Sequence, residues 1–296
     1  MNLVAVICAG LVGGAALLGC SGEEQITTSG ASGPLPSFGH VVLVVEENAD
    51  YASVIGNPSM PYLNSLARQY GLATQYHADT HPSIGNYFML TAGQVVTNDD
   101  GYSGTVDVDN IVRELIAAGK TWKSYAEDLP SVGYIGPSEG NYARRHNPLS
   151  FFSDVVNDPT QRQNLVPFSW FATDLADQSL PDYAFVVPNL CNDGHDCGLS
   201  TADSWLKTNI GPLIESPTFQ RDGLLIITFD EAHSDATGGG GRVAWVVVSP
   251  KAKRGYQSAA TYGHESTLRL TAQALGLTTY PGAAGSASNM SEFFQQ

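Results

Sequence analysis

The strongest constraint on the fold is an uninterrupted apolar run, HVVLVVE, at residues 40–46. Five successive aliphatic side chains leave no polar face, which is typical of a parallel strand covered on both sides. Similar runs lie at 72–76, 121–125, 183–188, 224–229 and 243–248, and helical patterns lie at 61–70, 108–118, 170–177, 201–214 and 266–275. This alternation predicts an α/β fold, a three-layer α/β/α sandwich around a mostly parallel central sheet.

The chain before residue 38 has the character of an export signal followed by a linker. Residues 1–19 carry no charged side chain and end at Cys20, which resembles a bacterial lipoprotein signal with lipid on the Cys20 thiol, although the usual basic residue is missing. An ordinary secretory signal or an uncleaved anchor is the alternative. Residues 20–37 are rich in Ser, Gly, Thr and Pro, which predicts a flexible tether. We expect a globular domain at 38–296, lipid-anchored in the cell envelope or periplasm of a bacterium.

The cysteines indicate an oxidising compartment. Cys8 and Cys20 belong to the signal, which leaves Cys191 and Cys197 in the domain. In an exported protein we expect these two to form a short-loop disulfide, with two free buried thiols as the alternative.

The charge balance excludes one class of partner. Asp and Glu number 29 against 14 Lys and Arg, which gives a net charge of −15. This field repels the phosphate backbone of nucleic acids, so nucleic acid is not an expected partner. Any phosphate chemistry here requires a local cation to offset the field.

Polar residues follow the predicted strands at the edge where ligands of such sheets bind. Glu47 and Asn48 follow the first strand, and Asp230 and Glu231 follow the run at 224–229. Carboxylate and amide oxygens of this kind suit Mg, Ca, Mn or Zn, so these four residues are the candidate divalent cation ligands. The alternative is a set of solvated acidic strand ends.

Ser83 is the candidate nucleophile. It follows a Pro-containing loop and precedes an apolar segment, which places it near a helix N-terminus, where the dipole favours an anion. A metal in contact with its hydroxyl would activate it. A simple N-cap is the alternative role.

Six short motifs resemble, in order, those of the bacterial and fungal phosphoesterase family, which holds acid phosphatases and phospholipases C and is similar to a branch of the alkaline phosphatase superfamily. They are EENADY at 46–51, HPSIGNY at 81–87 with TAG at 91–93, RHNP at 145–148, NDGHD at 192–196, FDEA at 229–232 and GHE at 263–265. The resemblance covers about residues 39–280. It implies an alkaline phosphatase-like fold.

The resemblance also implies roles for single residues. It makes Ser83 the nucleophile that becomes a phosphoserine, and Glu47, Asn48, Asp230 and Glu231 the ligands of a divalent metal. The positions around the phosphate are His195 and His264 as catalytic residues and Asp193, with Asn86, as phosphate-binding residues; Asp193, His195 and His264 could instead complete a second metal site. His146 follows the basic pair Arg144-Arg145, which makes it a further candidate phosphate-binding residue or, equally, a member of a loop ion pair. At Gly85 the sequence departs from the family, in which Pro is usual.

The function expected from this resemblance is metal-dependent hydrolysis of phosphate esters by a monomeric domain at 38–296. An acid phosphatase-type phosphomonoesterase is favoured over a phospholipase C-type phosphodiesterase, because the latter are longer. Gly136–Gly140 also fits the G-x-S-x-G pattern of serine esterases, with Ser138, Asp230 and His264 in matching order, but the segment has the composition of a turn. A lipid-anchored binding module without catalysis is the non-enzymatic alternative.

Overall fold

The computed structural model describes residues 34–295. The predicted signal at 1–19, Cys20 and the tether up to residue 33 lie outside the described residues. Every helix within the described range is too short or too polar to cross a membrane.

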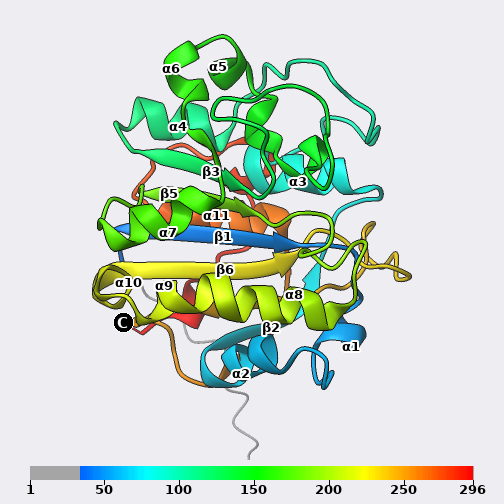
Figure 1. Cartoon of the computed structure of the whole chain (residues 1–296). Helices are drawn as coiled ribbons and strands as arrows, with labels where there is room; N and C mark the ends of the chain where they lie inside the picture. The colour runs from blue at the N-terminus through cyan, green and yellow to red at the C-terminus, as the bar shows by residue number, and fades with distance from the viewer. Residues whose placement is uncertain (1–33, 296) are drawn as a thin grey trace, which may run out of the picture. The chain divides into compact units, whose positions relative to one another are not determined.

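A single sheet of eight strands runs through the described residues (Figure 1) and confirms the predicted α/β class. In spatial order the strands are β4 (Leu165–Pro167), β3 (Trp122–Ala126), β5 (Tyr183–Val187), β1 (His40–Glu46), β6 (Gly223–Phe229), β7 (Trp245–Val248), β2 (Gly71–His77) and β8 (Tyr256–Gly263). Within this sheet β7 runs antiparallel to both of its neighbours, and the other pairs are parallel.

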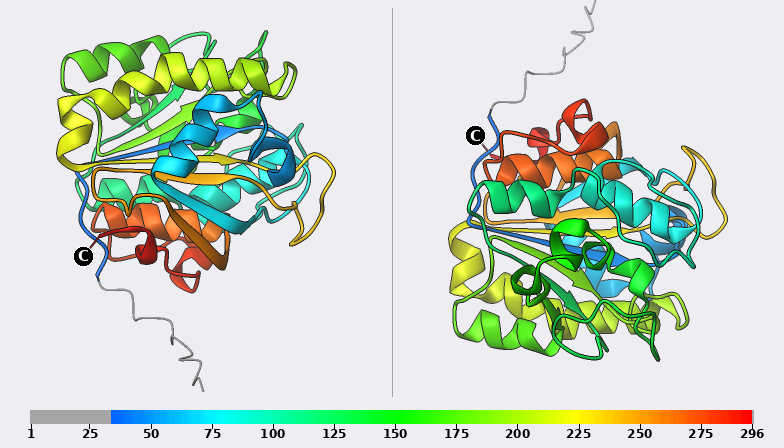
Figure 2. Two further views of the ribbon diagram at one scale, coloured as in Figure 1. Left: turned by 90° about the horizontal axis from the view of Figure 1, so that it is seen from below. Right: turned by 90° about the horizontal axis from the view of Figure 1, so that it is seen from above.

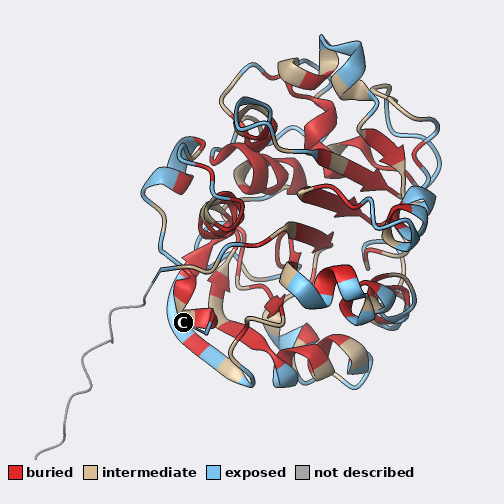
Figure 3. Cartoon of the chain, turned by 90° about the vertical axis from the view of Figure 1, so that its left-hand side faces the viewer, coloured by how far each residue is buried: buried red, intermediate tan, exposed pale blue. Residues whose placement is uncertain are grey.

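The central strand β1 is buried from Val41 to Glu46. It pairs in parallel with β5 and β6, and its register places Glu46 opposite Phe229. Because both neighbours are also buried along their whole length, the apolar run found in the sequence occupies the middle of the core (Figure 3).

Helices cover both faces of the sheet, as Figures 1 and 2 show, and complete the three layers. One face carries α2 (Pro61–Gln69), α7 (Ser169–Ala176), α8 (Leu199–Trp205) and α9 (Gly211–Glu215), and the other carries α3 (Ser83–Ala92), α4 (Ile111–Ala117) and α11 (His264–Ala274). Short helices α1 (Tyr51–Val54), α5 (Ser153–Val156), α6 (Pro159–Arg162) and α10 (Pro217–Asp222) lie in the connections. Several helices begin with standard caps: Asn110 accepts the N–H of Arg113 at 3.0 Å, and Ser216 accepts that of Phe219 at 3.2 Å.

The structure differs from the sequence prediction in one helix and in both edge strands. The helix expected at 201–214 is divided into α8, a π-helical turn over Leu206–Ile210 and α9. Pro212 explains this division, because it has no N–H to continue the helical ladder. Neither edge strand was predicted: β8 has four exposed residues and lacks an apolar run, and β4 has only three residues.

Candidate active site

The candidate site lies at the carboxyl edge of the sheet, on the right in Figure 1. Backbone hydrogen bonds extend the ladder beyond the strands: Asp230 N donates to Glu46 O at 3.0 Å, and Glu47 N donates to Asp193 O at 2.8 Å. These bonds bring the segments that follow β1, β5 and β6 together, as parallel pairing requires.

The carboxylate of Glu47 is the centre of this cluster. It is fully buried, and its Oε2 accepts hydrogen bonds from the Ser83 hydroxyl at 3.3 Å and from Asn48 Nδ2 at 3.2 Å. Its Oε1 accepts a short hydrogen bond from the Tyr87 hydroxyl and lies 3.3 Å from His146 Nε2. Four side chains from three separate segments thus converge on one carboxylate.

Ser83 is the first residue of α3, and the helix N-cap position is occupied by Pro82. The alternative of a capping serine is therefore wrong. Burial raises the pKa values of Asp230 and Glu231 to about 7, and the Ser83 hydroxyl opposes part of that rise.

A group of possible metal ligands lies beside Ser83. Ligand atoms of Glu47, His146 and Asp193 all lie within 4.8 Å of one another, and all three side chains are buried. His146 Nε2, Asp193 Oδ2 and Asp230 Oδ2 are buried without a hydrogen-bond partner. In the part of the chain that the structure describes, no other such group of three was found. Imidazole nitrogen with carboxylate oxygen is a donor set that divalent metals use, so these residues fit a cation.

The pKa shifts of these residues also favour a bound cation. Burial, followed by the charges of Asp230 and Asp193, raises the pKa of Glu47 well above its ordinary value. Burial also raises the pKa of Asp193 to about 8 and that of Asp230 to about 7. Burial and the charges of Arg145 and His195 hold the pKa of His146 well below its ordinary range, so its ring is neutral and able to bind a metal.

Asn48 and Asp230 are held next to this group. Asn48 has a positive φ of 50°, and its backbone N–H donates to Asp230 Oδ1 at 3.1 Å. Asn tolerates the left-handed region better than most residues. Two of the four predicted ligands are therefore locked against each other, and Glu47 is a third member of the same cluster.

Glu231, the fourth predicted ligand, faces a different set of groups. Its Oε2 lies 2.9 Å from His81 Nδ1 and accepts from Asn86 Nδ2 at 3.3 Å. Asn86 is fully buried, and its Oδ1 accepts the N–H groups of Asp79 and Thr80 at 3.0 and 3.1 Å. Asn86, expected to bind phosphate, thus fastens the loop that leads into Ser83.

The two predicted catalytic histidines differ in position. His264 is fully buried, with Nε2 2.6 Å from the backbone oxygen of Asp230 and Nδ1 3.0 Å from the Tyr76 hydroxyl. The contact at Nε2 therefore holds the backbone of Asp230 in place. Burial lowers the pKa of His264 to about 4. The side chain of His195 is about one-third exposed, with Nδ1 2.6 Å from Asp196 Oδ1 and its ring centre 6.3 Å from that of His146.

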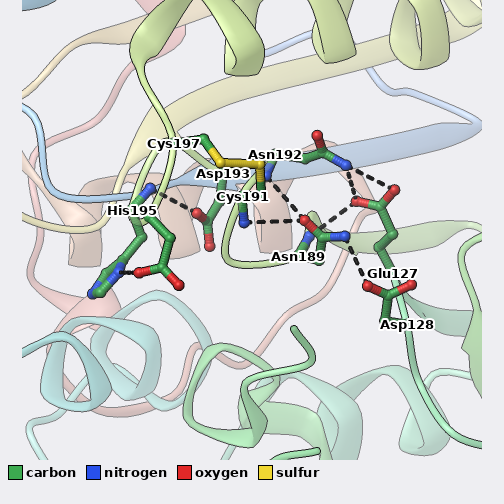
Figure 4. The surroundings of a disulfide bond; sticks show 9 residues. Glu127, Asp128, Asn189, Cys191, Asn192, Asp193, His195 and Cys197 are labelled. Atoms are coloured by element: carbon green, nitrogen blue, oxygen red, sulfur yellow. Dashed lines mark hydrogen bonds and ion pairs between the residues drawn. A yellow bond between two sulfur atoms is a disulfide. The ribbon is translucent and has the colours of Figure 1, made fainter. Parts of the chain in front are cut away.

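The loop that carries Asp193 and His195 is closed by a disulfide between Cys191 and Cys197, as expected (Figure 4). The backbone N–H of His195 donates to Asp193 Oδ1 at 2.8 Å. On the other side of the loop, Glu127 accepts the Asn189 N–H at 3.0 Å and both of its oxygens accept from Asn192 (Figure 4). Glu127 was missed in the sequence, although it directly follows β3 at the same sheet edge.

Arg145 and Asp100 are two further residues that the motifs did not single out as a pair. Arg145 Nε lies 3.6 Å from Asp100 Oδ2, and Asp100 Oδ1 accepts the N–H of Ile84, next to Ser83, at 3.1 Å. Burial raises the pKa values of Glu47 and Glu231, and the positive charge of Arg145 offsets a small part of that rise. A cation therefore lies at the site of an otherwise acidic protein.

The structure does not assemble a serine esterase triad around Ser138. Its hydroxyl accepts the N–H of Arg144 at 3.0 Å, while both ring nitrogens of His264 are engaged elsewhere. Ser138 also lies in a turn between loops, without the strand and helix that a nucleophile elbow requires.

The departure at Gly85 has a local cause. A Cβ atom at Gly85 would lie 2.3 Å from Asn98 Oδ1 and 2.6 Å from Thr80 Cγ2. The loops packed against the first turn of α3 therefore exclude a larger residue here.

Comparison with known proteins gives consistent results. Residues 57–278 match the model of a family described as the Phosphoesterase family. The chain is 41% identical over 204 residues to a phosphatidylinositol-3-phosphatase of Mycobacterium tuberculosis, covering 68% of this chain and 66% of that protein. It is 37% identical to a probable acid phosphatase of Kluyveromyces lactis, covering 66% of this chain and 48% of that protein. The chain thus spans about half to two-thirds of the length of these relatives.

Solved structures agree on the fold. A protein of the alkaline phosphatase superfamily from Vibrio parahaemolyticus aligns with a TM-score of 0.58 at 13% identity, covering 82% of this chain and 67% of that one. The lipoteichoic acid synthase LtaP of Listeria monocytogenes aligns with a TM-score of 0.60 at 10% identity, covering 83% and 75%. These likenesses confirm the expected alkaline phosphatase-like architecture.

Proposed function

The chain belongs to the phosphoesterase family, and from that premise we propose that it hydrolyses phosphate monoesters with the help of a divalent metal ion, through a phosphoserine on Ser83. One observation carries the proposal: the Ser83 hydroxyl, at the N-terminus of α3, lies 3.3 Å from Glu47, which belongs to the group of possible metal ligands. The names of the relatives, phosphatidylinositol-3-phosphatase and acid phosphatase, support this class of substrate.

We assign the metal to Glu47, His146 and Asp193, with Asp230 and Asn48 beside them, because three buried polar atoms in this cluster make no hydrogen bond. When bound, a divalent cation supplies positive charge that offsets the carboxylates and favours the alkoxide form of the serine. The candidate metals are Ca, Zn, Mg and Mn.

The chain's own residues then share the reaction as follows. The Ser83 hydroxyl passes its proton to Glu47, its acceptor in the structure, as the Oγ–phosphorus bond forms and the bond from phosphorus to the leaving oxygen breaks. His195, held through Nδ1 by Asp196 and partly exposed, gives a proton to the departing alcohol. Water then attacks phosphorus and gives a proton to His195, the Oγ–phosphorus bond breaks, and the proton on Glu47 returns to the serine oxygen as inorganic phosphate leaves.

Other residues bind or position. Arg145 is placed to bind a phosphate oxygen, and Asp100 holds it against the first turn of α3. His264 fixes the backbone of Asp230, and Asn86 fixes the loop before Ser83. These assignments give His264 and Asn86 positioning roles in place of direct contact with phosphate.

A substrate panel on chelated and metal-restored protein tests this proposal. We expect turnover of p-nitrophenyl phosphate to vanish on chelation and return with one of the four metals, with slower turnover of bis-p-nitrophenyl phosphate. Ser138→Ala is the control for the esterase alternative and should retain activity. Full activity of protein that analyses as metal-free would overturn the metal assignment, and a preference for the diester would favour the phospholipase C-type alternative. A protein inactive on both esters with every metal would instead favour a binding module.

We also propose that the protein is exported and anchored by lipid on Cys20. The Cys191–Cys197 disulfide supports an oxidising compartment. Labelled palmitate should enter the native protein but not a Cys20→Ser variant. Equal labelling of both, or a wholly unlabelled native protein, would contradict the anchor.

A further inference from the structure

Arg144 is buried without a counter-ion, which is unusual in a protein with a net charge of −15. Arg144 is the first residue of the 3-10 turn Arg144–His146. Within residues 34–295, no carboxylate lies within ion-pair distance of its guanidinium. Burial of an unpaired cation costs free energy, and a bound anion would offset that cost.

The contacts of Arg144 are all with neutral groups. Nε donates to Ser150 Oγ at 3.3 Å, Nη2 to Ser150 O at 3.0 Å and Nη1 to Ser103 O at 3.5 Å. One face of the guanidinium stacks on Phe151, with 4.1 Å between the Cζ atom and the ring centre. A guanidinium has five N–H groups, so two remain after these three bonds.

These remaining donors belong to a side chain that lines a cavity of about 270 Å³. Tyr102 and Ser138 add hydroxyl groups to its wall, and its charged side chains are Arg144, Arg145 and Asp100. Because Asp100 is already paired with Arg145 and with the N–H of Ile84, the cavity keeps one net positive charge.

The cavity adjoins the candidate active site. Arg145 and Asp100 line it, and Asp100 also holds the residue that follows Ser83. The next residue in the chain, His146, contacts Glu47. The cavity therefore shares Arg145 and Asp100 with the immediate surroundings of Ser83.

From these observations we propose that the cavity is a subsite for a second anionic group, carried on the alcohol part of the substrate and bound by Arg144. This inference rests on the proposed phosphomonoesterase activity and deepens it by naming a substrate class, phosphomonoesters that bear a further oxyanion. Planar guanidinium donors suit phosphate and carboxylate equally, and the experiment separates the two.

The test compares phosphomonoesters of straight-chain alcohols that end in a methyl group, a carboxylate or a second phosphate, over several chain lengths. We expect the metal-loaded wild type to show a kcat/KM about tenfold higher for at least one anionic series than for the methyl series. Arg144→Gln should bring that ratio close to one, and Arg144→Lys should lower it partly. Arg221→Gln, an equal loss of charge on the exposed α10 arginine, should leave the ratio unchanged.

Using the ratio cancels any general loss of folding or chemistry that the Arg144 variants suffer. A wild type with no preference for either anionic series, or an Arg144→Gln ratio equal to that of the wild type, would overturn the subsite. If Arg144→Gln does not fold, the wild-type preference and the Arg144→Lys ratio still decide. Calorimetry compares the binding of an alkylbisphosphonate with that of the matched alkylphosphonate. This measurement tests the subsite independently of the proposed phosphomonoesterase activity. Preferential bisphosphonate binding that Arg144→Lys weakens would support the subsite even in a protein that hydrolyses no ester.

Discussion

The hydroxyl of Ser83 lies 3.3 Å from Oε2 of Glu47, although 36 positions separate them in the chain. Ser83 begins α3, whereas Glu47 follows the last residue of the central strand. The same carboxylate also contacts His146, so the serine lies at the border of the group of possible metal ligands. This relationship between a helix start and a strand end is the basis of the proposed chemistry.

Replacement of Glu47 by Gln keeps the volume of the side chain and removes its charge. We expect kcat for p-nitrophenyl phosphate to fall at least about a hundredfold, because the proton acceptor of Ser83 and a metal ligand are lost together. Metal content should fall in parallel, as measured by elemental analysis. Glu215→Gln, at an exposed position of α9, is the matched control. Unchanged metal content and kcat in Glu47→Gln would remove Glu47 from the site.

Proton and metal should compete for the acidic cluster. Burial raises the pKa of Asp193 to about 8 and that of Asp230 to about 7 in the metal-free fold. The folded state therefore binds more protons than the unfolded state between the ordinary carboxyl pKa and these values, so metal-free stability falls as pH rises through that range. We expect the melting temperature of metal-free protein to decrease from about pH 5 to about pH 8, and the gain on adding metal to increase over the same range. A metal-induced gain that is larger at the acid end would contradict this linkage.

The disulfide should matter more for catalysis than for stability. It closes a loop of six positions, and so short a loop contributes only about 2 kcal/mol to the free energy of unfolding. The loop carries Asp193 and His195, however, and we expect the Cys191→Ser/Cys197→Ser double variant to lose a larger share of kcat/KM. Urea unfolding and steady-state kinetics on the same preparation check both quantities. A large loss of stability with unaltered kinetics would mean that the disulfide serves stability and not catalysis.

Asp100 offers a test of positioning. Asp100→Asn retains an oxygen for the Ile84 N–H but removes the charge that faces Arg145. We expect KM to rise about tenfold with a smaller change in kcat, because Arg145 is then less fixed for phosphate binding. Asp99→Asn, at the exposed neighbouring position, should change neither constant. An effect on kcat alone would argue against a role in binding.

Much of the fold was predictable, because strands that are buried on both faces have uninterrupted apolar runs in the sequence. The run from Val41 to Val45 identified the central strand, and the polar residues Glu47 and Asp230 after β1 and β6 identified the edge that carries the site. The edge strand β8 was missed because its residues are largely exposed, so it needs no apolar run.

The site was predictable in its strand ends and less so in its loops. His146 was assigned to phosphate, whereas the structure places it with Glu47 and Asp193. It lies in irregular 3-10 turns whose sequence has no period, and its partner at Glu47 is set by tertiary packing. The pairing of Asp100 with Arg145 likewise joins two loops and has no local signal.

The most direct test of the account is the chemical identity of the phosphorylated residue. Metal-loaded protein is mixed with p-nitrophenyl phosphate, quenched in acid, digested and analysed by mass spectrometry. We expect phosphate on Ser83 of the wild type, no phosphopeptide in Ser83→Ala, and a fall in kcat of several orders of magnitude in that variant. Phosphate on another residue, or a Ser83→Ala variant with nearly normal kcat and an unchanged melting temperature, would contradict the central claim.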